Sequence, residues 1–203
     1  MSNMAATLNE PSDTHAARRA MINSQLRTSG VNEEFVLSRM MAVPREDFLP
    51  ENKASLAYID RSIDLEEGGA LASPLFYGKL LIEAAPMPDD RVLVVEGGTG
   101  YLTELLRPLV ASTDTIDAAE AASGAPEGEF SLIVVDGAIE ALPDALANCL
   151  AVDGRIVSGL LLRDVTRLAS ARKVAGRVLL QPVEDIGIPV LHEFDKPTGW
   201  TFP

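Results

Sequence analysis

Residues 91–101 read RVLVVEGGTGY and join an apolar run to a cluster of glycines. The run Val92–Val95 has the pattern of a parallel strand that is buried on both faces. A helix is expected from Tyr101 to about Leu109. A strand, a glycine-rich turn and a helix in this order leave backbone N–H groups free to bind a negatively charged ligand. This stretch therefore predicts an α/β fold with a nucleotide-type ligand site at the turn.

Two common nucleotide-binding motifs are excluded at this turn. The dinucleotide pattern G-x-G-x-x-G fails because Thr103 stands at its third glycine, and no G-x-x-x-x-G-K-[ST] occurs in the chain. The spacing of Gly98 and Gly100 remains, and it serves equally for a ligand site or a simple chain reversal. Asp117 lies 19 residues beyond Gly98, the spacing at which a carboxylate reaches a ribose hydroxyl. A plain surface carboxylate is the alternative at Asp117.

Working outward, strands alternate with helices, which predicts a parallel sheet. Further strands are expected at Phe130–Val135, at Arg155–Leu160 and around Val178–Leu180. Helices are expected at 16–28, 74–85, 143–150 and 164–173, and one more helix is expected to begin at a cap formed by Asn32. The expected organisation is a loose tail over 1–13 and one domain over 14–203. This domain divides into an N-terminal helical and loop part, 14–74, and a Rossmann-like part, 75–203.

The composition limits the class of protein. With 47% hydrophobic and 23% charged residues, the chain is expected to fold as a globular domain. The 30 acidic against 17 basic residues give a net charge of −13, which disfavours nucleic acid and membrane surfaces as partners. One cysteine and two distant histidines predict no metal site. The N-terminus has no apolar run of the signal-peptide type, so we expect a cytoplasmic protein.

Several segments in order resemble one enzyme family, the protein-L-isoaspartate O-methyltransferases, which are class I S-adenosylmethionine (SAM) enzymes. The resemblance lies in VPREDFLP at 43–50, AYID at 57–60, the loop at 92–101, the strand FSLIVVDG at 130–137 and GRIV at 154–157. It implies a Rossmann-like class I methyltransferase sheet preceded by N-terminal helices. It also implies cofactor contacts at Gly97, Gly98, Thr99, Gly100 and Asp117, and a substrate cleft near Tyr58, Asp60 and Asp136.

The active-site segment departs from the family pattern. The family has a segment similar to G-Q-T-I-S-Q-P, and this chain has GGALASP at 68–74. Ala72 stands where the family has its catalytic serine, and Ala70 where it has a threonine. Ser73 is better explained as the cap of the helix that Pro74 begins. No catalytic residue is therefore assigned.

The loop at 92–101, where the resemblance places the cofactor, also departs from the family pattern. The acidic residue at the end of the strand is replaced by Val94, and the first glycine of the loop by Glu96. A carboxylate at Glu96 fills space that the backbone leaves open, and it sets a like charge near the carboxylate of SAM. Single defects of this type cost about 1–3 kcal/mol. We therefore expect impaired binding of SAM, which is the only cofactor that the resemblance implies.

The segment after Asp117 is short. Only twelve residues, 118–129, separate Asp117 from the next strand, and one crossover alone needs about a dozen. The edge strand that the family places here is therefore expected to be absent, and a short helical or loop patch takes its place. Because this exposes a new sheet edge, we expect a homodimer or a protein partner to cover it.

Two hypotheses about function follow. The first is a methyltransferase-like protein that has lost its chemistry and acts as a binding or assembly module. It is favoured by the loss of the hydroxyl groups, of the loop glycine and acid, and of the segment after Asp117, where the resemblance implies an acidic contact to the adenine. The second is an active SAM-dependent O-methyltransferase of the protein-L-isoaspartate type, because Gly98, Gly100 and Asp117 can still hold part of the cofactor.

Overall fold

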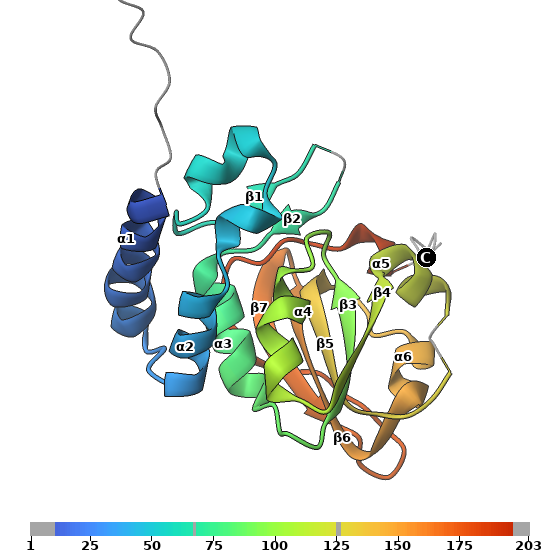
Figure 1. Cartoon of the computed structure of the whole chain (residues 1–203). Helices are drawn as coiled ribbons and strands as arrows, with labels where there is room; N and C mark the ends of the chain where they lie inside the picture. Colours follow the sequence, from blue (N-terminus) through green and yellow to red (C-terminus); the bar gives the residue numbers. More distant parts are fainter. Residues whose placement is uncertain (1–10, 67, 125–126, 197–203) are drawn as a thin grey trace, which may run out of the picture.

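The computed structural model describes residues 11–66, 68–124 and 127–196. Its centre is a six-stranded sheet with the strand order β4-β3-β5-β6-β7-β8. The first four strands pair in parallel, and β7 and β8 are antiparallel additions at one side. The chain leaves β3 toward β4 on one side and returns to β5 on the other (Figure 1). In open α/β sheets, such a reversal of strand order is where ligands bind.

The elements follow the expected alternation of helix and strand in the middle of the chain. The α-helices are α1 (Pro11–Met21), α2 (Glu34–Ala42), α3 (Pro74–Ala84), α4 (Tyr101–Leu106), α5 (Ala118–Ser123) and α6 (Asp144–Cys149). The strands are β1 (Ile63–Asp64), β2 (Ala70–Leu71), β3 (Arg91–Glu96), β4 (Ser112–Asp117), β5 (Phe130–Ile139), β6 (Leu150–Leu162), β7 (Val165–Arg172) and β8 (Gln181–Asp185). Short 3-10 or π turns are Ile22–Leu26, Arg27–Ser29, Arg45–Phe48, Glu51–Leu56, Arg107–Leu109 and His192–Phe194.

The strand β3 is buried on both faces, as its apolar run predicts. Val92 and Val94 pack into one hydrophobic cluster, together with α3 and α4, and Leu93 and Val95 pack into a second cluster with α5 and α6. Alternate residues of a strand point to opposite faces, so one short run supplies both cores. Figure 1 shows α1, α2 and α3 on one side of the sheet and α5 and α6 on the other.

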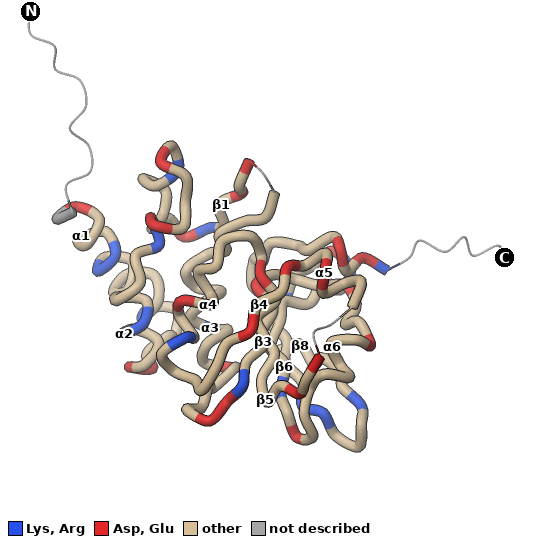
Figure 2. Tube along the Cα trace, turned by 45° about the vertical axis from the view of Figure 1, so that its right-hand side comes forward, with Lys and Arg blue, Asp and Glu red and all other residues tan. Residues whose placement is uncertain are grey.

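The strand β4 forms an edge of the sheet, as the short segment after Asp117 predicts. It pairs only with β3 among the described residues, and α5 follows directly where the family would have a longer crossover. Figure 2 shows acidic residues on β4 and around α5. Charged side chains on an edge strand discourage the addition of further strands. The partner that we expect at this edge remains a prediction.

The predicted helix at Asp164–Lys173 is wrong. These residues form β7, which pairs antiparallel with β6 from Leu162 and Val165 onward. Arg163 and Asp164 both have positive φ angles, 54° and 61°. Positive φ at both central residues is the geometry of a tight hairpin turn, so the pairing with β6 overrides the helical pattern of the sequence.

Two smaller expectations also need correction. Asn32 does not cap α2, because Glu33 occupies the cap position and makes no side-chain hydrogen bond there. The strand expected around Val178–Leu180 lies slightly later in the chain, at β8. By contrast, Ser73 does cap α3, because its hydroxyl accepts a hydrogen bond from the N–H of Phe76 at 3.3 Å.

The segment between α2 and α3 is held by a buried arginine. Arg45 has no exposed surface, and it donates from Nε to the carbonyl of Ala57 and from Nη2 to the carbonyl of Ala72, both at 2.7 Å. Its guanidinium also lies 5.5 Å from the ring centre of Tyr77 and 5.1 Å from that of Tyr101. Arg45 therefore joins the segment between α2 and α3 to the buried aromatic residues of α3 and α4.

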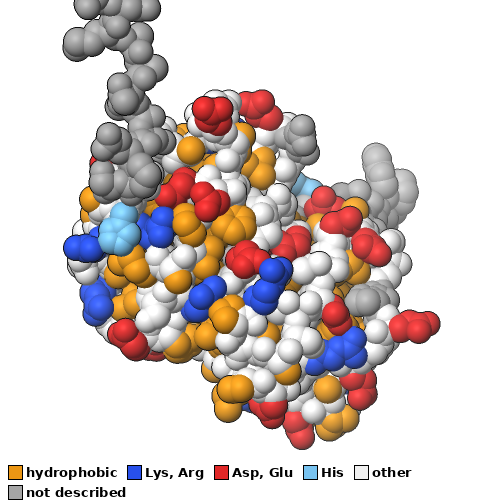
Figure 3. Space-filling model, in the orientation of Figure 1, with side chains coloured by type: hydrophobic (Ala, Val, Ile, Leu, Met, Phe, Trp, Pro, Cys, Tyr) orange, Lys and Arg blue, Asp and Glu red, His pale blue; other side chains and the backbone are white. Residues whose placement is uncertain are grey.

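The surface agrees with the acidic composition. Figure 3 shows Asp and Glu side chains spread over the visible face, with Lys and Arg side chains between them. No helix among the described residues is long and apolar enough to span a bilayer.

Replacing Arg45 tests its structural role. We expect Arg45→Met to lower the free energy of unfolding by about 2–4 kcal/mol, because the carbonyls of Ala57 and Ala72 lose their buried donors. Urea denaturation measures this change. Arg61→Met, at an exposed position, is the control, with an expected change within about 0.5 kcal/mol. Equal effects of the two substitutions would contradict this role.

Candidate cofactor cleft

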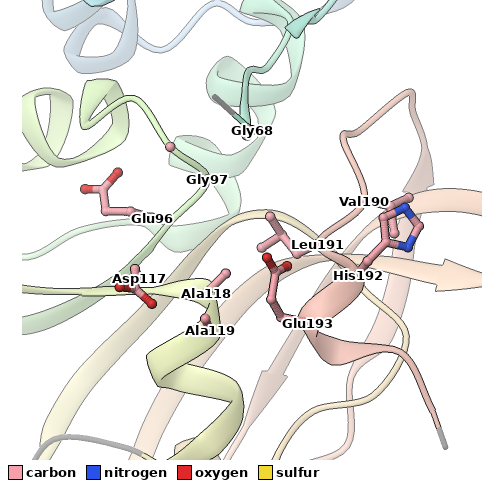
Figure 4. Close-up of a pocket in the computed structure, with 12 residues that line it drawn as sticks. Gly68, Glu96, Gly97, Asp117, Ala118, Ala119, Val190, Leu191, His192 and Glu193 are labelled. Carbon is pink, nitrogen blue, oxygen red and sulfur yellow. The ribbon is translucent and has the colours of Figure 1, made fainter. Parts of the chain in front are cut away.

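A cavity of about 400 Å³ lies at the carboxyl ends of β3 and β4. This volume is in the range of small-molecule sites. Three parts of the chain line it, and Figure 4 shows them together. They are the loop residues Gly68 and Gly69, the strand ends with Glu96–Gly98 and Asp117–Ala119, and the C-terminal segment Val190–Glu193. Of the cofactor contacts expected from the sequence, Gly97, Gly98 and Asp117 line this cavity.

Glycine is required at two positions of the loop. A Cβ on Gly97 would stand 2.1 Å from the carbonyl oxygen of Asp136, far inside contact distance. Gly98 has a φ angle of +112°, which side chains rarely adopt. Neither position therefore accepts a side chain without a shift of the backbone, and the loop presents bare backbone to the cavity.

Glu96 is the last residue of β3, and its side chain binds the turn that leads to α4. Its carboxylate accepts a hydrogen bond from the N–H of Gly100 at 3.1 Å and a second one from the hydroxyl of Thr103. Figure 4 shows this side chain directed away from Glu193. Burial raises the pKa of Glu96, and the bonds from Thr103 and Gly100 act in the opposite direction. The sequence indicates an obstruction at Glu96, but it gives no sign that the carboxylate binds its own loop.

The expected contacts at Thr99 and Gly100 lie beside the cavity and do not line it. The hydroxyl of Thr99 accepts a hydrogen bond from the N–H of Tyr101 at 3.3 Å. Gly100 has a φ angle of +74° and stands at the cap position of α4. Both residues therefore shape the turn, and the N–H of Gly100 is already bonded to Glu96.

Asp117 stands at the end of β4, directly beside Glu96 of β3 in the pairing of the two strands. Its Oδ1 accepts a hydrogen bond from the N–H of Glu120 at 2.7 Å and so caps α5. The side chain is exposed toward the cavity rather than buried in the core. Asp117 thus lies at the cavity, and the ribose contact expected from its spacing to Gly98 stays a prediction.

The C-terminal segment forms a wall of the cavity that the sequence does not predict. The N–H of Ala138 donates to the carbonyl of Pro189 at 2.7 Å, and the N–H of Leu191 donates to the carbonyl of Ala138 at 2.9 Å. A Cβ on Gly137 would stand 2.6 Å from the side chain of Leu191, so glycine makes this contact possible. No periodic pattern in the sequence marks this pairing with the end of β5.

The segment 68–74, the counterpart of the family's active-site segment, lies directly on the glycine loop. The N–H of Ala70 donates to the carbonyl of Gly97 at 3.0 Å. Gly69 has a φ angle of +77°, and a Cβ there would stand 2.5 Å from the same carbonyl oxygen. Ala72 is completely buried, with its N–H bonded to the hydroxyl of Tyr77 at 3.2 Å. The position of the family's catalytic serine is therefore an apolar, buried one in this chain.

Asp136, which the resemblance places near a substrate cleft, is buried beneath the loop and does not line the cavity. It is 2% exposed, and its Oδ2 accepts a hydrogen bond from the hydroxyl of Tyr77 at 3.2 Å. Its Oδ1 is buried without a partner among the described residues. Burial, together with the charge of Glu96, raises the pKa of Asp136 to about 8. The protonated form is therefore favoured at neutral pH.

Tyr58 and Asp60 lie outside this cavity. The hydroxyl of Tyr58 donates to Glu46 and accepts from Arg18 Nε at 2.7 Å, and Arg18 and Glu46 form an ion pair at 3.1 Å. Burial and the bond to Glu46 raise the pKa of Tyr58. Asp60 is exposed. The group around Tyr58 ties α1 to the segment between α2 and α3, which is a structural role.

The residues that line the cavity carry an unusual charge pattern. Glu96, Asp117 and Glu193 supply three carboxyl groups, and no Lys or Arg is among the described lining residues. The basic candidate is His192, whose Nδ1 lies 3.1 Å from Asp195 and whose side chain is 78% exposed. The described residues contain no cluster of His, Cys, Asp and Glu able to hold a metal ion.

Comparisons with known proteins agree on one family. The family model described as protein-L-isoaspartate(D-aspartate) O-methyltransferase matches residues 16–124. A protein-L-isoaspartate O-methyltransferase of Koribacter versatilis (strain Ellin345) is 30% identical over 193 residues, which cover 83% of this chain and 87% of that protein. One of Methanoculleus marisnigri is 29% identical over 209 residues and covers 90% of this chain and 93% of that protein.

Solved structures show the same fold. A Plasmodium falciparum protein described as a protein-L-isoaspartate O-methyltransferase, in complex with S-adenosyl-L-homocysteine, superposes with a TM-score of 0.67 at 19% identity. The match covers 87% of this chain and 98% of that one. A second protein-L-isoaspartate O-methyltransferase structure has a TM-score of 0.69 at 16% identity, covering 86% of this chain and 65% of that one. The class I methyltransferase fold expected from the sequence is thus confirmed.

The buried carboxyl of Asp136 gives the protein a testable pH dependence. Because the pKa is about 8 in the folded chain against 3.8 for an ordinary aspartate, the folded state keeps a proton that the unfolded state loses. This contribution to stability is complete below pH 3.8, declines as the pH rises, and is lost above about 8. The decline approaches about 1.4 kcal/mol per pH unit for one proton.

Urea unfolding of the wild type and of Asp136→Asn at pH 5, 6, 7 and 8 measures this effect. We expect the wild type to lose stability relative to the variant across this range. When both proteins also carry Glu96→Gln, the loss of stability with rising pH should end at a lower pH, because the charge of Glu96 helps to raise the pKa of Asp136. Parallel stability curves for the wild type and Asp136→Asn would rule out the raised pKa.

Proposed function

Because this chain belongs to the protein-L-isoaspartate O-methyltransferase family, we propose that it binds an adenosyl ligand of the SAM class in this cleft. We further propose that it acts as a methyltransferase of that family. The observation that carries the proposal is the position of Asp117 beside the open glycine loop, at the reversal of strand order. Asp117 would accept hydrogen bonds from the ribose hydroxyls, and Gly97 and Gly98 would leave room for the ligand.

The names of the relatives support this proposal. The Koribacter and Methanoculleus proteins are named as protein-L-isoaspartate O-methyltransferases, and the Plasmodium structure contains S-adenosyl-L-homocysteine. The match to the Koribacter protein extends over most of both chains. We therefore propose that the acceptor is a protein carboxyl group of the isoaspartyl type.

The residues of the cleft fit the adenosyl part of SAM better than its amino-acid part. The cavity beside Asp117, Ala118 and Ala119 is open and partly apolar, which suits a nucleoside. At the other end, the carboxylate of Glu96 accepts the N–H of Gly100, so this donor is not available to the α-carboxylate of SAM.

A second function is favoured by the active-site segment. Ala70 and Ala72 are buried and offer no hydroxyl groups, which agrees with a protein that retains the fold as a binding or assembly module. In this case the edge strand β4 is the surface that a second copy or another protein would cover. The two functions differ in whether a methyl group is transferred.

Methyl transfer to an isoaspartyl peptide separates the two functions. We expect the purified protein, supplied with SAM carrying a radiolabelled methyl group, to label the peptide above the level of a reaction without protein. The aspartyl form of the same peptide is the control substrate. Binding of an adenosyl ligand without any labelling would contradict methyl transfer and favour the module.

The role of Asp117 is tested by calorimetric titration with S-adenosyl-L-homocysteine. We expect Asp117→Ala to weaken binding about tenfold, because the ribose hydroxyls lose a charged acceptor. Asp114→Ala is a matched control. It removes a carboxylate from the same strand, but one that pairs with Arg91 at 2.8 Å and does not line the cleft. An unchanged isotherm for Asp117→Ala would refute the ribose contact.

A further inference from the structure

Glu96 is held firmly at the loop end of the cleft. Its two carboxylate oxygens are both engaged, one with the N–H of Gly100 and the other with the hydroxyl of Thr103. The carboxylate therefore occupies the place that a negatively charged group of a ligand takes when it binds at such a turn. An entering carboxylate would have to displace a side chain that belongs to the protein.

The neighbouring charges act in the same direction. Asp117 lies beside Glu96 at the end of the paired strand, and Glu193 faces the same cavity from the C-terminal segment. Figure 4 shows Asp117 and Glu193 on the two sides of the space between the strand ends and this segment. No Lys or Arg is among the described lining residues, so no permanently charged basic side chain there compensates a further negative charge. A neutral or positively charged ligand meets no such repulsion.

We infer that Glu96 selects the charge of the ligand, so that this cleft takes an adenosyl compound without an α-carboxylate in preference to SAM. A sulfonium or thioether nucleoside whose side chain is neutral or ends in an amine has this chemistry. The inference rests on the proposed function, because it takes the cleft as an adenosyl site. It adds that Glu96 determines which members of that ligand class bind.

The test compares ligands with and without the α-carboxylate of SAM. Decarboxylated SAM retains the sulfonium and the amine of SAM and lacks only the carboxylate. A parallel pair is 5′-methylthioadenosine, which is uncharged and has no amino-acid part, against S-adenosyl-L-homocysteine. Isothermal titration calorimetry of the full chain gives a dissociation constant for each ligand. The ratio for decarboxylated SAM against SAM isolates the effect of the carboxylate, and the second pair measures the effect of the whole amino-acid part.

We expect the wild type to bind decarboxylated SAM at least about tenfold more tightly than SAM, which corresponds to about 1.4 kcal/mol. Glu96→Gln removes the charge and can still accept the hydrogen bond from Gly100, and it should bring the ratio to within about threefold of one. Glu96→Gly restores the glycine of the family pattern. It should raise the affinity for SAM and leave that for 5′-methylthioadenosine nearly unchanged.

Glu120→Gln is the matched control. It removes one carboxylate from the same end of the sheet, but at an exposed position whose side chain does not line the cleft. The ligand ratio should stay at its wild-type value in this variant. Thermal melting of each variant verifies that the fold is retained, and Glu96→Gly provides a second way to remove the charge if Glu96→Gln is unstable.

The outcomes separate the inference from the proposed function. Equal affinities of the wild type for SAM and decarboxylated SAM, or a ratio that Glu96→Gln leaves unchanged, overturn the selection by charge while the adenosyl site stands. Binding of the carboxylate-free ligands without transfer to an isoaspartyl peptide supports the selection and refutes the methyltransferase. No binding of any of the four ligands, even by Glu96→Gly, overturns both.

Discussion

The hydrogen bond from the N–H of Gly100 to the carboxylate of Glu96 determines what the turn after β3 can bind. In an α/β sheet, this turn usually offers its N–H groups to an anionic ligand. Here the anion is part of the chain, and Thr103 holds it from the first turns of α4. Below the loop, burial raises the pKa of Asp136, and the charge of Glu96 adds to this effect. The side chain of Glu96 therefore has three effects: it binds the loop, it favours the protonated form of Asp136, and it adds a carboxylate to the lining of the cleft.

The position of this loop depends in turn on contacts that leave no room for side chains. Gly69 and Gly97 approach so closely that a Cβ on Gly69 would stand 2.5 Å from the carbonyl oxygen of Gly97. Arg45 holds the other end of the segment through the carbonyl of Ala72. Because the segment is fixed by backbone contacts, it keeps its place although Ala72 replaces the family's serine.

The sequence predicts best where local patterns and tertiary packing agree. The run Val92–Val95, the cap at Ser73 and the edge position of β4 follow from local pattern or chain length, and the structure agrees with them. The helix expected at 164–173 fails because pairing with β6 decides that segment. The wall formed by Pro189–Leu191 depends on hydrogen bonds to Ala138, some fifty residues earlier, which no local pattern announces.

The titration of the Gly100 amide by NMR tests the role of Glu96 most directly. If Glu96 accepts this N–H, the amide proton resonance of Gly100 should move as the carboxylate is protonated, with a midpoint above the ordinary pKa of glutamate because the side chain is buried. The movement should disappear in Glu96→Gln. A Gly100 resonance that does not change with pH in the wild type, or that changes equally in Glu96→Gln, would contradict the binding of the Glu96 carboxylate to this turn.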